Sequence, residues 1–230
     1  TMLRVVLADR SGAIPGVQFD VPNYVVESLK AGDGVEVTGR VGEYRDELQV
    51  NIERILPAEL EDLSVFLPAA RRPMREMLAE FDALRASIQQ PDLARLLEAI
   101  FGDGTFYQAF TQAPAAKLYH HACVGGLLEH TLCVTRLVET ACSLYPELQR
   151  DLAVTVALLH DLGKVRAYDP RSFDLTQEGV IWSHLYIGAS QVEHAIAQLA
   201  GFDAELRLRV VHAVLAHHGK LEYGSPVVPM

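Results

Sequence analysis

The stretch Leu152–Lys164, LAVTVALLHDLGK, decides how the rest of the chain folds. Its apolar residues cover every side of a helix, and a helix that is apolar all round lies inside a bundle. The stretch continues into His160 and Asp161, so it predicts an imidazole and a carboxylate at the buried end of this helix. A buried carboxylate is costly unless it is paired, protonated or bound to a cation. We expect Gly163 to end the helix as C-terminal glycines commonly do, with Lys164 projecting from the turn.

A histidine next to an aspartate is by itself more often structural than catalytic, with the carboxylate satisfied by backbone donors or an arginine. The other histidines favour a different interpretation. Imidazoles are expected at helix ends or on inward helix faces at His130, His160, His184, His217 and His218. Neutral imidazoles with one carboxylate are ligands for a borderline divalent metal: Mn, Fe, Co, Ni or Zn. Because Asp161 has two oxygens, it can bridge two ions about 3.5–4 Å apart, as in two-metal hydrolytic sites.

Length and composition limit the class of protein. A chain of 230 residues can form one large domain or two small ones. It contains no uninterrupted apolar run of about 18 residues and no basic-then-apolar start, so we expect no membrane contact and no secretory signal. Three cysteines without a CxxC pair indicate buried thiols in a reducing cytoplasm. The net charge of −10 argues against a broad, non-specific grip on nucleic acid, but not against a local site where metal ions supply positive charge.

Residues 1–56 differ in kind from the rest. Alternating apolar residues and turn residues predict strands at 3–9, 17–20, 35–41 and 48–55, a helical turn at 24–29 and a hairpin loop at 42–47. This pattern resembles the oligonucleotide/oligosaccharide-binding (OB) fold, a five-stranded barrel. The first strand is missing from the pattern, so we expect a partial barrel.

Aromatic residues of this module are candidates for stacking on bases. Phe19, Tyr24 and Tyr44 could stack, while Arg4, Arg40, Arg45 and Arg54 follow the phosphates. In the alternative interpretation the aromatic rings fill the barrel interior and the arginines are solvated. For Phe19 we favour the interior role, and for Tyr44 in the hairpin loop both roles stay open.

We expect residues 57–73, rich in Pro, Glu and Arg, to link this module to an all-α bundle at 74–230. Apolar spacing and caps predict its helices at 74–88, 91–101, 122–144, 146–161, 183–200 and 203–218.

The histidine motifs carry a resemblance to a known family. GGLLEHT at 125–131, HDLGK at 160–164, His184 and HHG at 217–219 resemble the HD superfamily of metal-dependent phosphohydrolases. The longer stretches HHACVGGLLEHT and AHHGKLEYGSPVVPM, behind an OB module, are similar to the YhaM-type 3′–5′ exoribonucleases.

The resemblance implies roles for these residues. His130, His160 and Asp161 would hold one metal ion. The second ion would be held by Asp161, His184, His217 and His218. Lys164 would contact the scissile phosphate, which makes Asp161 and Lys164 the catalytic candidates. His120 could contact substrate at the mouth of the site, although we favour a capping or surface role for it.

The sequence departs from the superfamily pattern in one respect. The final aspartate has no match, since the only acid after His218 is Glu222. We therefore expect the chain to be part of a longer one; if it ended here, the first ion would have three protein ligands and activity would be in doubt. The HD-GYP signature is absent, so cyclic-di-GMP hydrolysis is not expected. Cys133 is expected to be a core thiol, and His194 and His212 surface or interhelical residues.

These observations favour metal-assisted hydrolysis of a phosphodiester in single-stranded RNA or DNA, with the OB module feeding the 3′ end to the bundle. Two alternatives stay open. One is an HD nucleotide phosphohydrolase with a regulatory OB module. The other is a nucleic-acid-binding protein whose metal site is structural or vestigial. The sequence leaves metal identity and homo-oligomerisation undecided.

Overall fold

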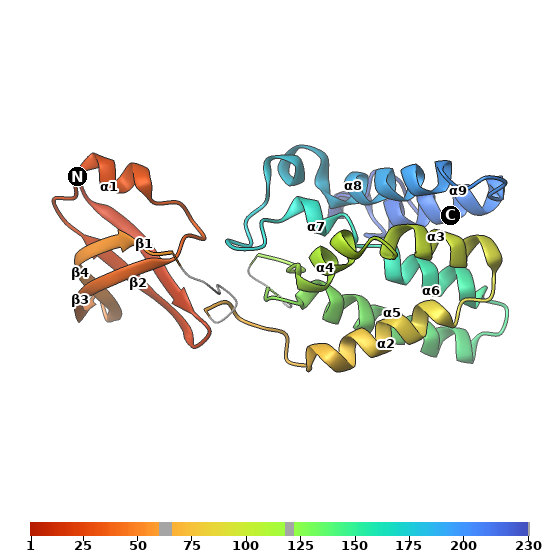
Figure 1. Cartoon of the computed structure of the whole chain (residues 1–230), viewed down its shortest axis with the longest axis horizontal. Coiled ribbons are helices and arrows are strands. Elements are labelled where there is room, and N and C mark those ends of the chain that lie inside the picture. The colour runs from red at the N-terminus through yellow and green to blue at the C-terminus, as the bar shows by residue number, and fades with distance from the viewer. Residues whose placement is uncertain (60–65, 118–121, 230) are drawn as a thin grey trace. The chain divides into compact units, whose positions relative to one another are not determined.

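The computed structural model describes residues 1–59, 66–117 and 122–229. The chain forms two compact units, Thr1–Ala69 and Ala70–Met230, which Figure 1 shows as an all-β unit with one short helix and a helical unit. No helix in the described parts of the chain combines the length and apolar character needed to cross a membrane.

The N-terminal unit is a small open sheet of the OB type, as predicted. Its elements are β1 (Leu3–Asp9), β2 (Gly12–Gln18), α1 (Asn23–Ser28), β3 (Val35–Tyr44) and β4 (Glu47–Pro57). The strand order is β1-β2-β4-β3, with antiparallel hairpins β1–β2 and β3–β4 joined by a parallel pairing of β2 with β4. Val21, Ile52 and Ile55 form its small buried core.

Two local predictions in this unit were wrong. β2 begins at Gly12 and ends before Phe19, whose side chain is 67% exposed rather than inside the barrel. The strand lacks visible alternation because a glycine, Gly16, fills an inward position, where an added Cβ would lie 2.8 Å from the Ile52 side chain. The β3–β4 connection is a two-residue turn of Arg45 and Asp46, both with positive φ, which is tighter than the predicted loop.

The C-terminal unit is a helical bundle, which confirms the predicted class. Its helices are α2 (Met74–Ala86), α3 (Pro91–Phe101), α4 (Gly104–Gln112), α5 (Gly126–Leu144), α6 (Arg150–Leu159), α7 (Lys164–Ala167), α8 (Gln177–Ala197) and α9 (Ala204–Ala216), followed by a short 3₁₀ helix, Leu221–Tyr223. The central helix α6 packs against α3, α5 and α9, and its Val154, Leu158 and Leu159 have no exposed surface.

Helix α4 was not among the predicted helices. Its sequence GTFYQAFTQ is rich in aromatic and β-branched residues, which have only modest helix propensity. The helix is capped by the side chain of Asp103 and packs Phe110 against Phe81 and Phe101, with ring centroids 5.3 and 5.1 Å apart. Tertiary packing therefore stabilises a helix that its own sequence specifies weakly.

The turn after Asp161 differs from the prediction. Gly163 has φ −64°, an ordinary right-handed helical value, and it begins α7 rather than ending α6 in a left-handed cap. Glycine is required there because an added Cβ would lie 2.1 Å from the His184 carbonyl oxygen and 2.6 Å from the Gly188 nitrogen. Helix α7 thus lies directly against the backbone of α8.

Helix α8 starts at Gln177, before the predicted start, but it is interrupted at Ser183, where φ is 58° and ψ is 157°. The predicted segment corresponds to the part after this break. The break falls immediately before His184, so this imidazole projects from the first turn of a new helical segment. A non-glycine residue in this conformation is strained, and such strain is concentrated at functional sites.

Candidate metal centre

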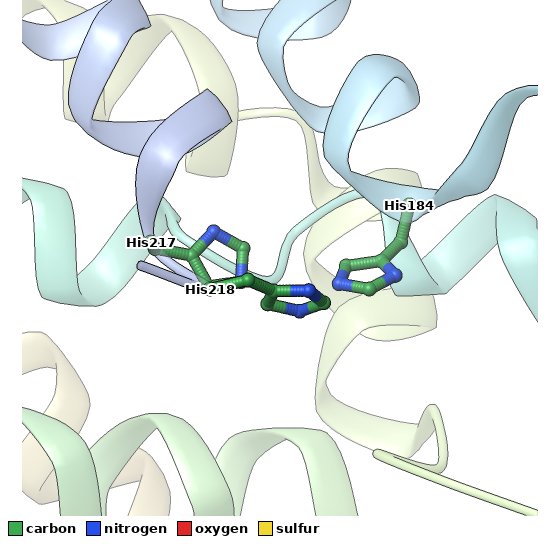
Figure 2. A group of neighbouring side chains, drawn as sticks. All are labelled: His184, His217 and His218. Atoms are coloured by element: carbon green, nitrogen blue, oxygen red, sulfur yellow. The ribbon is translucent and has the colours of Figure 1, made fainter. Parts of the chain in front are cut away.

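The histidines predicted from sequence converge at one end of the bundle. α5 contributes His130, the end of α6 contributes His160 and Asp161, α8 contributes His184, and the end of α9 contributes His217 and His218. Figure 2 shows His184, His217 and His218 with their rings side by side, although α8 and α9 are separate helices. The His218 ring centroid lies 5.0 Å from that of His184 and 4.7 Å from that of His217.

Oδ2 of Asp161 faces one group of side chains. Asp161 is only 2% exposed, and its Oδ2 lies 3.1 Å from His130 Nε2 and 3.2 Å from His160 Nε2. The ammonium of Lys164 lies 2.8 Å from the same oxygen. The two imidazole nitrogens are also only 3.2 Å from each other. Imidazole nitrogens this close together suit a hydrogen bond between the rings or a metal ion that both can bind.

Oδ1 of Asp161 faces a different group. His184 Nε2 lies 3.4 Å from it and His217 Nε2 lies 3.5 Å from it. The two carboxylate oxygens therefore point toward separate sets of imidazoles, one at the ends of α5 and α6 and one at α8 and α9. This is the arrangement that a bridging carboxylate requires.

Backbone carbonyls fix the orientation of three imidazoles. The contacts from Nδ1 to a carbonyl oxygen are His160 to Ala157 (2.8 Å), His217 to Val214 (2.7 Å) and His218 to Tyr223 (2.6 Å). A ring that donates Nδ1–H to a carbonyl keeps its lone pair on Nε2, which is then free to bind a cation. The contact to Tyr223 was not foreseen, because a carbonyl on a later turn leaves no mark in the sequence.

The protonation states suit ligand chemistry. Burial alone would raise the pKa of the Asp161 carboxyl, but His160, His130 and His217 outweigh burial and hold this pKa well below its ordinary value. Burial, together with Lys164 and the neighbouring imidazoles, lowers the pKa of His184 to about 3, although the negative charge of Asp161 acts in the opposite direction. Asp161 is therefore ionised and His184 neutral at neutral pH, as metal binding requires.

The cluster also contains buried polar atoms without hydrogen bonds. Within residues 1–59, 66–117 and 122–229, neither Asp161 Oδ1 nor His184 Nε2 has a hydrogen-bond partner, since their 3.4 Å contact lacks suitable geometry. Candidate ligand atoms lie within 4.8 Å of one another in two groups: His130, His160 and Asp161, and His184, His217 and His218. Orphaned buried atoms and an imidazole–carboxylate donor set fit divalent metal ions.

The remaining candidates lie elsewhere. Tyr44 belongs to the N-terminal unit, where it is 56% exposed next to the β3–β4 turn with the Arg45 guanidinium 5.2 Å from its ring centre. His120 lies outside the described residues. The prediction of a core thiol at Cys133 was wrong: it lies on the outer face of α5 and is exposed, whereas Cys123 is buried. His194 is exposed and His212 half-buried, and neither joins the cluster.

The burial of Glu129 was not predicted from the sequence. Glu129 lies next to His130 in the first turn of α5 and accepts a hydrogen bond from the backbone nitrogen of Arg72 at 3.3 Å. This contact ties the segment before α2 to the start of the helix that carries His130.

A helical bundle with this order of histidines and an aspartate defines a class, the HD-domain proteins. The HD domain model matches residues 127–227, and an OB-fold nucleic acid binding domain model matches residues 1–58. The chain is 34% identical over 232 residues to two proteins named 3′-5′ exoribonuclease YhaM, from Bacillus pumilus (strain SAFR-032) and Bacillus velezensis (strain DSM 23117 / BGSC 10A6 / LMG 26770 / FZB42). Each alignment covers 99% of this chain and 73% of the relative. The chain therefore belongs to the YhaM family. No solved structure matches it.

Proposed function

We propose that this protein is a metal-dependent 3′–5′ exoribonuclease that shortens single-stranded RNA. Its relatives bear that name, and its two units are of the OB and HD types. The observation that carries the proposal is the Asp161 carboxylate, whose two oxygens face two separate groups of imidazoles.

The proposed site holds two divalent ions from the series Mn, Fe, Co, Ni and Zn. The proposed ligands are His130, His160 and Asp161 for one ion, and Asp161, His184, His217 and His218 for the other. Bound ions would supply Lewis acidity toward the phosphate oxygens and toward a water molecule.

The chain itself supplies charge and position. The Lys164 side chain is 14% exposed and its ammonium lies 2.8 Å from Asp161 Oδ2, so it can make a charge-assisted contact with a phosphate oxygen at the edge of the cluster. Burial of the cluster keeps bulk water away and strengthens these electrostatic contacts. The electrostatic field at the phosphate is therefore determined by these nearby charges rather than by the net charge of −10 of the whole chain.

We propose that residues 1–56 hold the RNA strand and that residues 57–73 connect them to the catalytic bundle, residues 74–230. The strand pairings place Arg4, Val17, Asn51 and Arg40 in one row across the sheet. Arg40 and Tyr44 lie on one face of β3, because residues four apart in a strand share a face. Two cations with an exposed aromatic ring suit a single strand, through phosphate contacts and base stacking.

Replacing Tyr44 with alanine is expected to weaken binding of a short single-stranded RNA by about 1–3 kcal/mol, the contribution of one stacked base. Fluorescence anisotropy at fixed salt measures this affinity. Tyr145→Ala is the matched control, since Tyr145 is similarly exposed but lies at the end of α5 in the other unit. Equal affinities for the Tyr44 variant and the native protein would exclude Tyr44 from the RNA contact.

The direction and metal dependence of cleavage test the proposed function. A 5′-labelled single-stranded RNA with a free 3′ hydroxyl is expected to shorten stepwise in the presence of Mn²⁺. A chelator is expected to stop the reaction, and the same RNA labelled at its 3′ end is expected to lose its label first. RNA that binds without shortening would show a binding protein, and release of the 5′ label first would show the opposite direction.

A further inference from the structure

The orientation of His218 depends on the chain that follows α9. The neighbouring imidazole, His217, has its Nδ1 at the carbonyl of Val214, which lies three residues earlier in the same helix. The Nδ1 of His218 instead lies 2.6 Å from the carbonyl oxygen of Tyr223, five residues later. This carbonyl belongs to the 3₁₀ helix after α9, so the backbone bonds of α9 do not hold it in place. The direction of the His218 ring therefore depends on how the later segment is attached.

The segment that carries this carbonyl, the 220–225 turn, is closed by bonds within itself. The Lys220 carbonyl accepts from the backbone nitrogen of Tyr223 at 3.0 Å and from that of Ser225 at 3.2 Å. Gly224 adopts a left-handed conformation with φ 84°, which reverses the chain between them. These bonds shape the turn, but they do not attach it to α9.

The Ser225 side chain makes the attachment. Ser225 is only 3% exposed, although its two neighbours in sequence are exposed. Its hydroxyl is shared between the carbonyl oxygens of Leu215, at 3.2 Å, and Val227. Leu215 lies in the last turn of α9, where helix carbonyls need partners from outside the helix. A buried hydroxyl therefore joins the 220–225 turn to the end of α9.

We propose that Ser225 is a positioning residue for the metal centre: its hydroxyl fixes the 220–225 turn against α9, so that the Tyr223 carbonyl holds the His218 imidazole with Nε2 available to an ion. The inference rests on the proposed function, which assigns His218 to one of the two ions. His218 belongs to a group of three imidazoles whose candidate ligand atoms lie within 4.8 Å of one another. A ligand that is oriented before metal binding loses less conformational freedom, so contacts that orient it raise metal affinity.

Ser225→Ala removes the hydroxyl and is tested by titrating the metal-free full chain with Co²⁺, whose visible absorption reports coordination. We expect two ions to bind native protein. In the variant, one binding step should weaken by about 10-fold, the lower end of the effect of removing a contact that orients a ligand, and the other should not change. Ser87→Ala is the matched control, because the Ser87 hydroxyl donates to the Leu84 carbonyl at 2.8 Å at the end of α2. It should lower the melting temperature without changing either binding step.

His218→Ala shows whether Ser225 acts through His218. This variant is expected to weaken the same Co²⁺ step more strongly. Adding Ser225→Ala to it should cause no further weakening, because two changes along one chain of contacts are not additive. Equal weakening by Ser225→Ala with and without His218 would overturn the inference, as would native Co²⁺ affinity in Ser225→Ala. Weakening of both steps would show a general structural role and would overturn it too.

Gly224→Val tests the Tyr223 carbonyl without changing Ser225, and it decides the question if Ser225→Ala does not fold. A β-branched residue is strongly disfavoured at the positive φ of Gly224, so the backbone that carries the carbonyl must move. We expect the same Co²⁺ step to weaken. The matched control is Gly201→Val, since Gly201 has φ 71°, lies between α8 and α9 and has no atom within 4 Å of an added Cβ. Native Co²⁺ binding in a folded Gly224→Val protein would contradict the inference.

Co²⁺ binding and RNA shortening are measured separately, so the inference and the proposed function can fail separately. If native protein binds Co²⁺ but does not shorten RNA, the proposed function fails, and the Co²⁺ titrations still decide the role of Ser225. If native protein shortens RNA and Ser225→Ala keeps native Co²⁺ binding, only the inference fails. Native protein without a Co²⁺ step that His218→Ala weakens would also overturn the inference.

Discussion

Asp161→Asn is expected to lower kcat/KM for RNA by about 1000-fold or more, because each carboxylate oxygen faces its own group of imidazoles. The substitution keeps the size of the side chain but removes the negative charge that both groups share. One amide oxygen cannot replace two anionic ones, so we expect bound metal to fall together with activity. Steady-state kinetics and metal analysis by mass spectrometry measure the two effects on the same sample.

A matched control separates this loss from damage to the fold. Asp103→Asn makes the same chemical change at the N-cap of α4, where the side-chain oxygen accepts from the Thr105 nitrogen at 2.9 Å. Asparagine caps a helix as well as aspartate does, so this variant should keep full activity and metal. A metal-loaded, active Asp161→Asn protein would refute the bridging role of Asp161.

The convergence of the cluster could be predicted because its signal is local. Each histidine lies next to apolar residues at helical spacing, so its inward direction follows from its own helix, as for His130 and His160. The positions where helices α6 and α9 end could be recognised from the sequence in the same way. Chemistry then restricts what several imidazoles around one buried carboxylate can bind.

Other features depend on residues far away in sequence and could not be predicted. Gly163 was interpreted as a helix-ending glycine, because nothing near it indicates that its Cα lies against the backbone of His184. Whether Cys133 is exposed and whether Gly104–Gln112 forms a helix likewise depend on which other elements pack against these residues. Phe19 is exposed and lies just after the end of β2 at Gln18, and Gly16 made the extent of this strand hard to recognise from the sequence.

Gly163→Ala is expected to impair the site more than the addition of one methyl group would suggest. The new Cβ would lie 2.1 Å from the His184 carbonyl oxygen and 2.6 Å from the Gly188 nitrogen, and both are backbone atoms that cannot rotate away. Helix α7 must therefore move from α8, which separates Asp161 and Lys164 from His184. We expect a loss of about 1–3 kcal/mol in the free energy of unfolding from overpacking. We also expect about a 100-fold loss of kcat/KM, because a displacement of about 1 Å at a catalytic site has an effect of this order.

A graded series of glycine substitutions shows whether this close approach is the cause. An added Cβ at Gly188 would meet the Gly163 nitrogen at 3.3 Å, a mild overlap, and one at Gly104 in the first turn of α4 would meet no atom within 4 Å. Activity and bound metal should therefore be lowest for Gly163→Ala, intermediate for Gly188→Ala and native for Gly104→Ala. Chemical denaturation gives the stability of each variant, so that activity is compared only among folded proteins. If Gly163→Ala were folded, metal-loaded and fully active, the backbone contact between α7 and α8 would not be what places Asp161 opposite His184.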